Sequence, residues 1–168
     1  MMLFWRNKRK SSDRAVIHAS LEDIRRAVLK YEDEMPAPIN RISLLQSDGT
    51  LDVSRLSRYL GGVPDQKFYL SRETYEIFPE EERHIPYYLD MVQNAVDDYL
   101  NETGKMPVVE GSPELEVDFK VLMQEHYLKE MPTIPLYVTE QELMLTHRPE
   151  RAGVQGNQQD SSVTILEL

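Results

Sequence analysis

The chain has 168 residues, a length that fits one domain with additional segments at its ends. It contains no cysteine, which excludes disulfides, cysteine-ligated metal sites and thiol catalysis. Its net charge of −10 repels phosphate backbones, so we expect no nucleic-acid partner. No apolar run approaches the roughly 18–20 residues that cross a bilayer, and the first apolar residues precede the basic ones, opposite to a secretory signal. We therefore expect a cytoplasmic protein that is not exported.

The charge is unevenly distributed along the chain. Residues 1–14 carry five basic groups and one acid, a net charge of +4, whereas the remaining residues carry −14. An apolar start leads directly into this basic cluster, a pattern typical of weak, salt-sensitive attachment to an anionic membrane. The alternative is a frayed start whose Trp5 packs on the domain. The residues of this basic head that we expect to bind a membrane or a partner are Phe4, Trp5, Arg6, Lys8, Arg9 and Lys10.

Hydrophobic periodicity and turn residues predict the secondary structure after the head. Ser20 with Asp23 resembles a capping box at a helix start, and Gly104 is a natural helix end. In chain order we expect a strand at 15–18, a helix over 21–35, a strand at 39–45, a turn at 47–50, a helix over 53–60, a strand at 67–70, an acidic loop at 79–82, a helix over 86–102, a strand at 107–109, a helix over 113–131, and strands at 136–138 and 142–146.

These elements predict one α+β domain over residues 15–149. We expect a small mixed sheet that is packed on one side by two or three helices. From residue 150 onward the chain is polar and loses its periodicity, so we expect a disordered tail over 150–168. The role of the apolar residues 163–168 within that tail stays open.

Two segments of the chain resemble each other weakly. Residues 68–75 and 136–143 both read as a strand, a hydroxyl residue and a polar stretch that ends in an apolar or aromatic residue. Met-Pro also recurs near three expected helix ends. We interpret the similarity as convergence, because any helix that leads into a strand benefits from a proline at its end.

Motifs for chemistry are absent from the sequence. It has no phosphate-binding loop, nucleophile elbow, zinc-protease motif or EF-hand loop, and we expect no metal site and no cofactor. Ser71 and Thr139 follow strands and are best explained as caps of backbone N–H groups. His147 follows a strand-like run, where it either caps local carbonyls or forms the centre of an unfamiliar hydrolase or metal-dependent enzyme.

Three stretches resemble a family of small uncharacterised proteins from Bacillus-type bacteria. They are 85–90 (IPYYLD), 104–109 (GKMPVV), and 137–140 (YVTE) with 146–149 (THRP). The resemblance covers residues 15–149 and implies a bacterial cytoplasmic setting, without any activity or cofactor. Together these observations predict a non-enzymatic accessory or adaptor protein with an unknown protein partner, attached loosely to the inner membrane face through its head.

Overall fold

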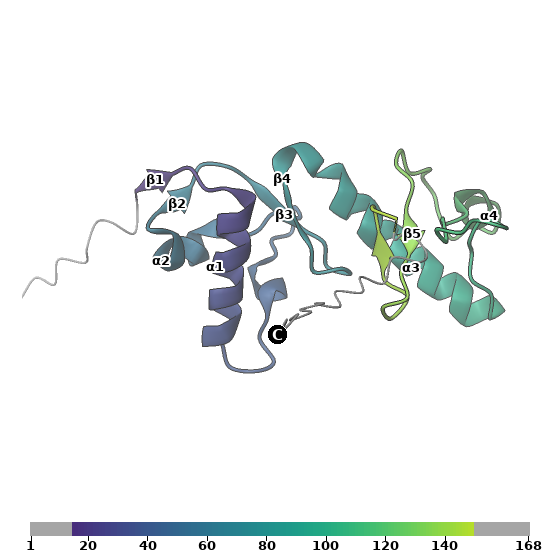
Figure 1. The fold of residues 1–168 in the computed structure, drawn as a ribbon, viewed down its shortest axis with the longest axis horizontal. Coiled ribbons are helices and arrows are strands. Elements are labelled where there is room, and N and C mark those ends of the chain that lie inside the picture. The colour runs from purple at the N-terminus through teal and green to yellow at the C-terminus, as the bar shows by residue number, and fades with distance from the viewer. Residues whose placement is uncertain (1–14, 150–168) are drawn as a thin grey trace, which may run out of the picture.

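A computed structural model describes residues 15–149 of the chain. The predictions for the head (1–14) and the tail (150–168) lie outside the described residues. Figure 1 shows two units that follow each other along the long axis of the molecule. The N-terminal unit covers residues 15–79 and the C-terminal unit covers residues 80–149, and the buried apolar side chains fall into two clusters that follow this division. The α+β class predicted from the sequence is confirmed.

The N-terminal unit packs one long helix against short strands. Its helix α1 (Leu21–Glu34) starts at Ser20, whose side chain accepts from the Asp23 backbone N–H while Asp23 accepts from the Ser20 N–H, so the predicted capping box is confirmed. Ile24 and Val28 on its inner face are fully buried. The other elements are β1 (Val16–Ile17), α2 (Ser57–Leu60), β2 (Val63–Pro64), β3 (Phe68–Leu70) and β4 (Ile77–Pro79).

The C-terminal unit is built on the longest helix of the described chain. This helix, α3 (His84–Thr103), ends at Gly104, whose φ of +70° is a left-handed conformation that glycine adopts without strain. Leu89, Val92 and Val96 form its fully buried face. The remaining elements are α4 (Phe119–Gln124), β5 (Tyr137–Val138) and β6 (Leu145–Thr146).

The strands pair in three separate sheets instead of the one mixed sheet that we expected. Strands β1 and β2 are parallel, whereas β3 pairs with β4 and β5 with β6 in antiparallel hairpins. Each strand has only two or three residues, and beyond their pairs β3 and β5 each make one isolated bridge, from Tyr69 to Thr50 and from Tyr137 to Glu116. The helices therefore pack against small strand pairs.

Two predicted elements are wrong because side-chain caps override the apolar pattern. The expected strand at 39–45 contains a 3₁₀ turn (Arg41–Leu44), which starts where the Asn40 side chain accepts from the Ile42 N–H at 2.9 Å. The expected helix over 113–131 is reduced to α4, because the Asp118 side chain caps a helix that begins only at Phe119. The expected strand at 107–109 makes only a single bridge, from Val108 to Val117.

The backbone hydrogen bonds of the two units repeat each other. In the N-terminal unit Leu51 N–H donates to the Phe68 carbonyl, and in the C-terminal unit Val117 N–H donates to the Leu136 carbonyl. The isolated bridges form matching pairs as well. Thr50 to Tyr69 corresponds to Glu116 to Tyr137, and Leu45 to Leu51 corresponds to Val108 to Val117. The hairpins close in the same way, by Ser71 N–H to Glu76 and by Thr139 N–H to Met144.

Side chains follow the same repeat at a constant spacing of 68 residues. The Tyr59 hydroxyl donates to the Glu34 carboxylate, and the Tyr127 hydroxyl donates to the Glu102 carboxylate. The two helices also share their inward positions. Leu21, Ile24, Ala27, Val28 and Tyr31 of α1 correspond to Leu89, Val92, Ala95, Val96 and Tyr99 of α3. Our interpretation of the sequence similarity as convergence is therefore wrong, because backbone bonds, core positions and polar pairs all recur. The helices and hairpins recur at 68 residues, and the bridging residues Leu45, Thr50 and Leu51 recur at 63 or 66.

Strand β4 connects the two cores. Successive side chains of a strand point to opposite faces, so Ile77 is buried in the N-terminal core and Phe78 in the C-terminal core. Only 2% of each residue is exposed. The two units therefore share a structural element although each has its own core.

This shared strand predicts that the two units unfold together. Ile77→Ala and Phe78→Ala should each lower the free energy of unfolding by about 2–5 kcal/mol, because each leaves a cavity in one core. Chemical denaturation followed by tyrosine fluorescence and by circular dichroism should give one coincident transition for both variants. Two separate transitions, with each variant affecting only one, would show that the units are independent.

Candidate functional site

A polar contact of several hydrogen bonds lies where α3 meets the hairpin of the preceding unit. Asp90 of α3 accepts hydrogen bonds from the Ser71 hydroxyl at 2.6 Å and from the backbone N–H groups of Arg72 and Glu73 at 3.1 and 3.2 Å. Ser71 is fully buried and its hydroxyl also accepts from the Thr74 N–H. The predicted capping role of Ser71 is thus confirmed, and Asp90 fixes the turn against α3.

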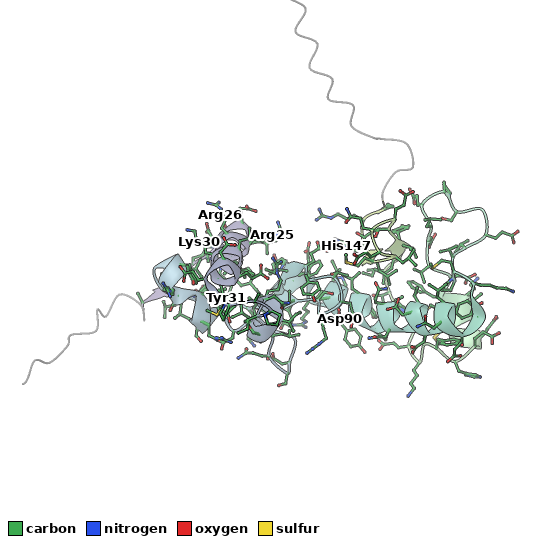
Figure 2. All side chains as sticks on the ribbon, turned by 90° about the horizontal axis from the view of Figure 1, so that it is seen from below. Arg25, Arg26, Lys30, Tyr31, Asp90 and His147 are labelled. Carbon is green, nitrogen blue, oxygen red and sulfur yellow. The ribbon has the colours of Figure 1, made fainter. Side chains whose placement is uncertain are left out.

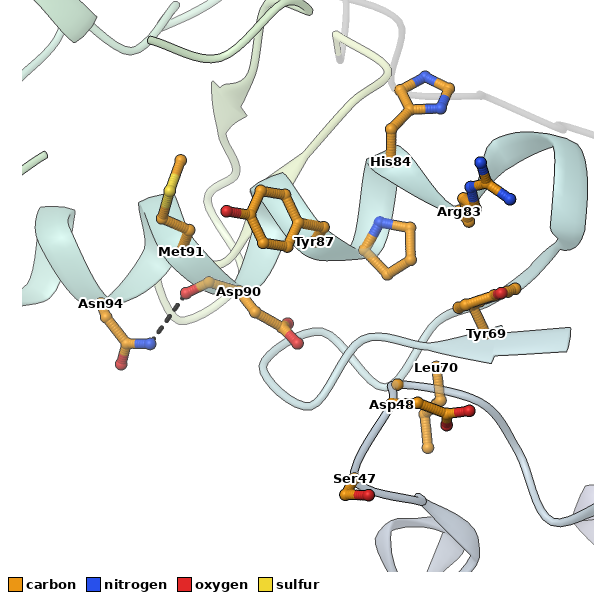
Figure 3. Close-up of a pocket in the computed structure, with 12 residues that line it drawn as sticks. Ser47, Asp48, Tyr69, Leu70, Arg83, His84, Tyr87, Asp90, Met91 and Asn94 are labelled. Carbon is orange, nitrogen blue, oxygen red and sulfur yellow. Dashed lines mark hydrogen bonds between the residues drawn. The ribbon is translucent and has the colours of Figure 1, made fainter. Parts of the chain in front are cut away.

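A groove of about 600 Å³ opens beside this contact. Figure 3 shows the start of α3 on one side of the groove and the turn after Ser47 with β3 on the other. Its size falls within the range of ligand pockets in proteins. The side chains that line it include Tyr69, Leu70, Pro86, Tyr87 and Met91 together with the charged Asp48, Arg83 and Asp90.

Both signs of charge line the groove, with Asp48 and Asp90 as the acids and Arg83 as the base. Hydrogen bonds from the Thr50 hydroxyl and N–H lower the pKa of Asp48, so this carboxylate stays ionised. Arg83, which precedes α3, is exposed. Tyr87 is 56% exposed, and its hydroxyl donates to Glu130 at 2.8 Å. Exposed tyrosine beside methionine and arginine is a composition typical of binding surfaces.

His147 lies near the middle of the molecule (Figure 2). Its ring contacts Phe78 edge to face with centroids 5.5 Å apart. Arg148 Nε donates to His147 Nε2 at 3.2 Å, so the proton of the neutral ring is on Nδ1. This Nδ1 is buried without a hydrogen-bond partner in the described chain and lies 4.0 Å from the Glu76 carboxylate.

The electrostatic environment favours the neutral form of this histidine. Burial lowers the pKa of His147, the nearby Glu76 opposes the shift, and Arg148 adds to it. We predicted that His147 either caps local carbonyls or forms an enzyme centre. In the structure its ring packs between the two units, against Phe78. One neighbouring carboxylate at 4.0 Å is the only feature that the enzyme hypothesis gains.

The other candidate residues do not gather around His147. His18 bonds to the Gln66 side chain at 2.8 Å, His84 is exposed at the groove, and His126 follows α4. Within residues 15–149, no group of three His, Cys, Asp or Glu side chains is placed to hold a metal ion. Thr139 differs from the expected cap, because its hydroxyl donates to the Met144 carbonyl at 2.7 Å.

Sequence reasoning missed both Asp90 and the repeat. Asp90 is 17 to 19 residues from the groups that it binds, so no local pattern shows the contact. The available signal was the shared apolar spacing of the two long helices, which the comparison of residues 68–75 with 136–143 did not include. The six head residues that we predicted as a binding site lie outside the described residues.

The net charge differs between the segments of the chain. Residues 15–79 contain eight basic and ten acidic side chains, whereas residues 80–149 contain five basic and fifteen acidic ones. The net charges are therefore −2 for the N-terminal unit and −10 for the C-terminal unit, next to +4 for the head. Figure 2 shows Arg25, Arg26 and Lys30 together on α1, in the N-terminal unit.

The sequence of residues 14–147 matches the model of a family described as Protein of unknown function (DUF3939), and the chain belongs to this family. The predicted membership of an uncharacterised family is confirmed, while the bacterial source stays a prediction. Searches of curated proteins and of solved structures gave no match. None of the helices in residues 15–149 combines the length and apolar character that a membrane crossing requires.

The Asp90 contact predicts a large effect from a small change. Asp90→Ala should lower the free energy of unfolding by about 2–3 kcal/mol, because it removes a charged acceptor and leaves the buried Ser71 hydroxyl without its partner. Urea denaturation measures this difference. Asp98→Ala is the matched control, since Asp98 is exposed on the same helix, and it should stay within about 0.5 kcal/mol of the parent.

The environment of His147 predicts a pH dependence. Its folded pKa is lowered, so the unfolded chain binds the proton first, and folding stability falls as the pH drops below about 6.5. His147→Gln cannot be protonated and should lose less stability over the same interval. Urea midpoints measured between about pH 7.5 and pH 5 give both slopes. Equal slopes would contradict the assignment of a depressed pKa to His147.

Proposed function

We propose that this member of the DUF3939 family is a non-enzymatic adaptor of the bacterial cytoplasm that is held at the inner membrane face by its head. The observation that carries the proposal is the charge gradient from +4 in the head, through −2, to −10 in the C-terminal unit. A surface of anionic lipids attracts one end of such a molecule and repels the other. The proposed lipid-binding residues are Phe4, Trp5, Arg6, Lys8, Arg9 and Lys10.

The head is strong enough for reversible attachment only. Four cations lie within residues 6–10, and each contributes about 1 kcal/mol near an anionic bilayer. Insertion of the apolar start, including Phe4 and Trp5, adds a few kcal/mol. Because the Coulombic part is screened by salt, the attachment is released at high ionic strength. This behaviour fits a peripheral protein that exchanges between membrane and cytoplasm.

The charges of the folded units favour one orientation on such a surface. The C-terminal unit, with its net charge of −10, is repelled from anionic lipid. The N-terminal unit is close to neutral and follows the head directly. The groove between the units is then held away from the bilayer, where a protein partner can reach the exposed Tyr87 and the acidic Asp48.

The hydrogen bonds that Asp90 and Ser71 already make support a binding role over catalysis. Asp90 and Ser71 bind each other and the hairpin backbone, and a carboxylate that already accepts three hydrogen bonds is a poor general base. His147 is neutral and packed against Phe78. In the described residues, only the Glu76 carboxylate, 4.0 Å from His147, favours the alternative of a hydrolase or metal-dependent enzyme centred on His147.

The head predicts binding to anionic vesicles by the full-length protein. Replacement of Arg6, Lys8, Arg9 and Lys10 by Gln should weaken binding about a thousandfold, because it removes about 4 kcal/mol of attraction. Sedimentation with vesicles of phosphatidylglycerol and phosphatidylcholine measures the affinity. Vesicles of phosphatidylcholine alone, or high salt, should abolish it.

A matched control and a spectroscopic readout keep this experiment decisive. Replacement of Lys67, Lys105, Lys120 and Lys129 by Gln removes the same charge from the folded units and should leave binding nearly unchanged. Trp5 is the only tryptophan, so its emission reports on the head alone and should shift to shorter wavelength on anionic vesicles. A blue-shifted emission that vesicles do not change would instead place Trp5 on the folded domain and overturn the proposal.

A further inference from the structure

Inside the molecule, Asp90 of α3 binds the turn at 71–73. Because the unit is repeated, each half of this contact occurs once more, in a place where it has no partner within the described residues. At the spacing of 68 residues, Glu22 of α1 is the counterpart of Asp90 of α3. The turn at 139–141 is likewise the counterpart of the turn at 71–73, to which Asp90 binds. The C-terminal unit therefore presents a hairpin turn that corresponds to the turn at 71–73. The N-terminal unit presents a helix start that corresponds to the start of α3.

The turn of the C-terminal unit differs from its counterpart in backbone conformation, with positive φ at Glu142 and Leu143 instead of at Tyr75 alone, but it too offers two N–H donors. The backbone N–H groups of Glu140 and Gln141, counterparts of the two that donate to Asp90, have no hydrogen-bond partner in residues 15–149. Both residues are exposed. Two partly exposed apolar side chains lie at this hairpin, since Leu143 is in the turn and the Leu115 carbonyl accepts from the Val138 N–H, and each is 39% exposed. The two N–H groups lack an acceptor, and the exposed apolar side chains lack a covering surface.

The start of α1 offers both features. Glu22 is exposed and makes only loose ion pairs with Arg25 and Arg26, each at 3.8 Å. Val16 is 75% exposed, and its counterpart is His84, which lines the internal groove. Leu29 is 54% exposed, and its counterpart Asp97 lies near the internal turn, where it contributes to the raised pKa of Glu73.

The charges at the two open faces are complementary, and they are reversed relative to the internal contact. Where α3 presents Asn94 and Asp98, α1 presents Arg26 and Lys30. Where the internal turn carries Arg72, the open turn carries Glu140. The open face of the C-terminal unit holds further acids at Glu110, Glu114 and Glu142.

We infer that a second copy of this chain docks head to tail, with the start of its α1 on the 139–143 turn of the first copy. Glu22 of one copy then accepts from the Glu140 and Gln141 N–H groups of the other, as Asp90 does within the molecule. Arg26 and Lys30 face Glu140 and Glu142. Such a contact joins different surfaces, so it leaves a free face at each end and extends into chains or closes into a ring.

The association is expected to be weak in solution. Inside the molecule, strand β4 holds α3 beside the turn, so no translational freedom is lost when the contact forms. A second copy loses that freedom on binding, which costs at least several kcal/mol. Sedimentation velocity of the full chain from about 10 µM to about 1 mM, at low salt, should therefore show a sedimentation coefficient that rises with concentration.

Charge reversal tests the faces separately. Glu140→Lys/Glu142→Lys and Arg26→Glu/Lys30→Glu should each weaken self-association at least tenfold, because each makes the two faces equal in sign. An equimolar mixture of the two variants restores complementary faces and should associate again. The control Asp98→Lys/Glu125→Lys makes the same charge change at exposed positions away from the open turn and should associate at least as well as the parent.

Glu22→Gln distinguishes this docking from nonspecific attraction. The variant makes the α1 face more positive, so a purely electrostatic contact becomes stronger, whereas the proposed contact loses its anchoring carboxylate and becomes weaker. A parent chain that stays monomeric at about 1 mM, or a mixture of reversed variants that fails to associate, overturns the inference. The assay contains no lipid, so its failure leaves the proposed membrane attachment unaffected.

Discussion

The carboxylate of Asp90 is the interaction on which the arrangement of the molecule depends. It satisfies the buried Ser71 hydroxyl and two backbone N–H groups of a turn that belongs to the preceding unit. A charged acceptor that is shared in this way fixes the angle between two elements as well as their distance. With α3 held on the turn, Phe78 enters the C-terminal core while Ile77 stays in the N-terminal one.

Repetition of one unit explains features that would otherwise look unrelated. The Tyr59–Glu34 and Tyr127–Glu102 pairs hold the same helix end in each unit, and acceptance by Glu102 raises the pKa of the Tyr127 hydroxyl to about 12. Units that stack through one type of contact expose an unsatisfied version of it at both ends. Natural arrays cover such ends with polar caps. Here the ends instead carry apolar side chains and opposite charges, which indicates surfaces that are used.

The sequence predicted the long helices and missed how they are connected. Helix α3 has many periodic apolar positions and a glycine cap, so its limits were predicted within two residues. Strand β4 has three residues, too few for an alternating pattern to be recognised. The helix expected over 113–131 is shorter because Asp118 caps its start, and the apolar residues before Asp118 suggested an earlier start. The groove could not be predicted, because its walls come from residues 47–49, 69–70 and 83–94, which only the tertiary structure brings together.

The proposed membrane attachment and the proposed self-association would reinforce each other on a surface. A head that contributes about 1 kcal/mol per cation dissociates readily as a single copy. Copies joined head to tail present several heads to one bilayer, and each further head binds at a high effective concentration without any new contact. The bilayer in turn concentrates the copies and compensates for the freedom lost on docking. Under the two proposals, interactions that are marginal alone would together make a cooperative switch controlled by anionic lipid content, salt and protein concentration.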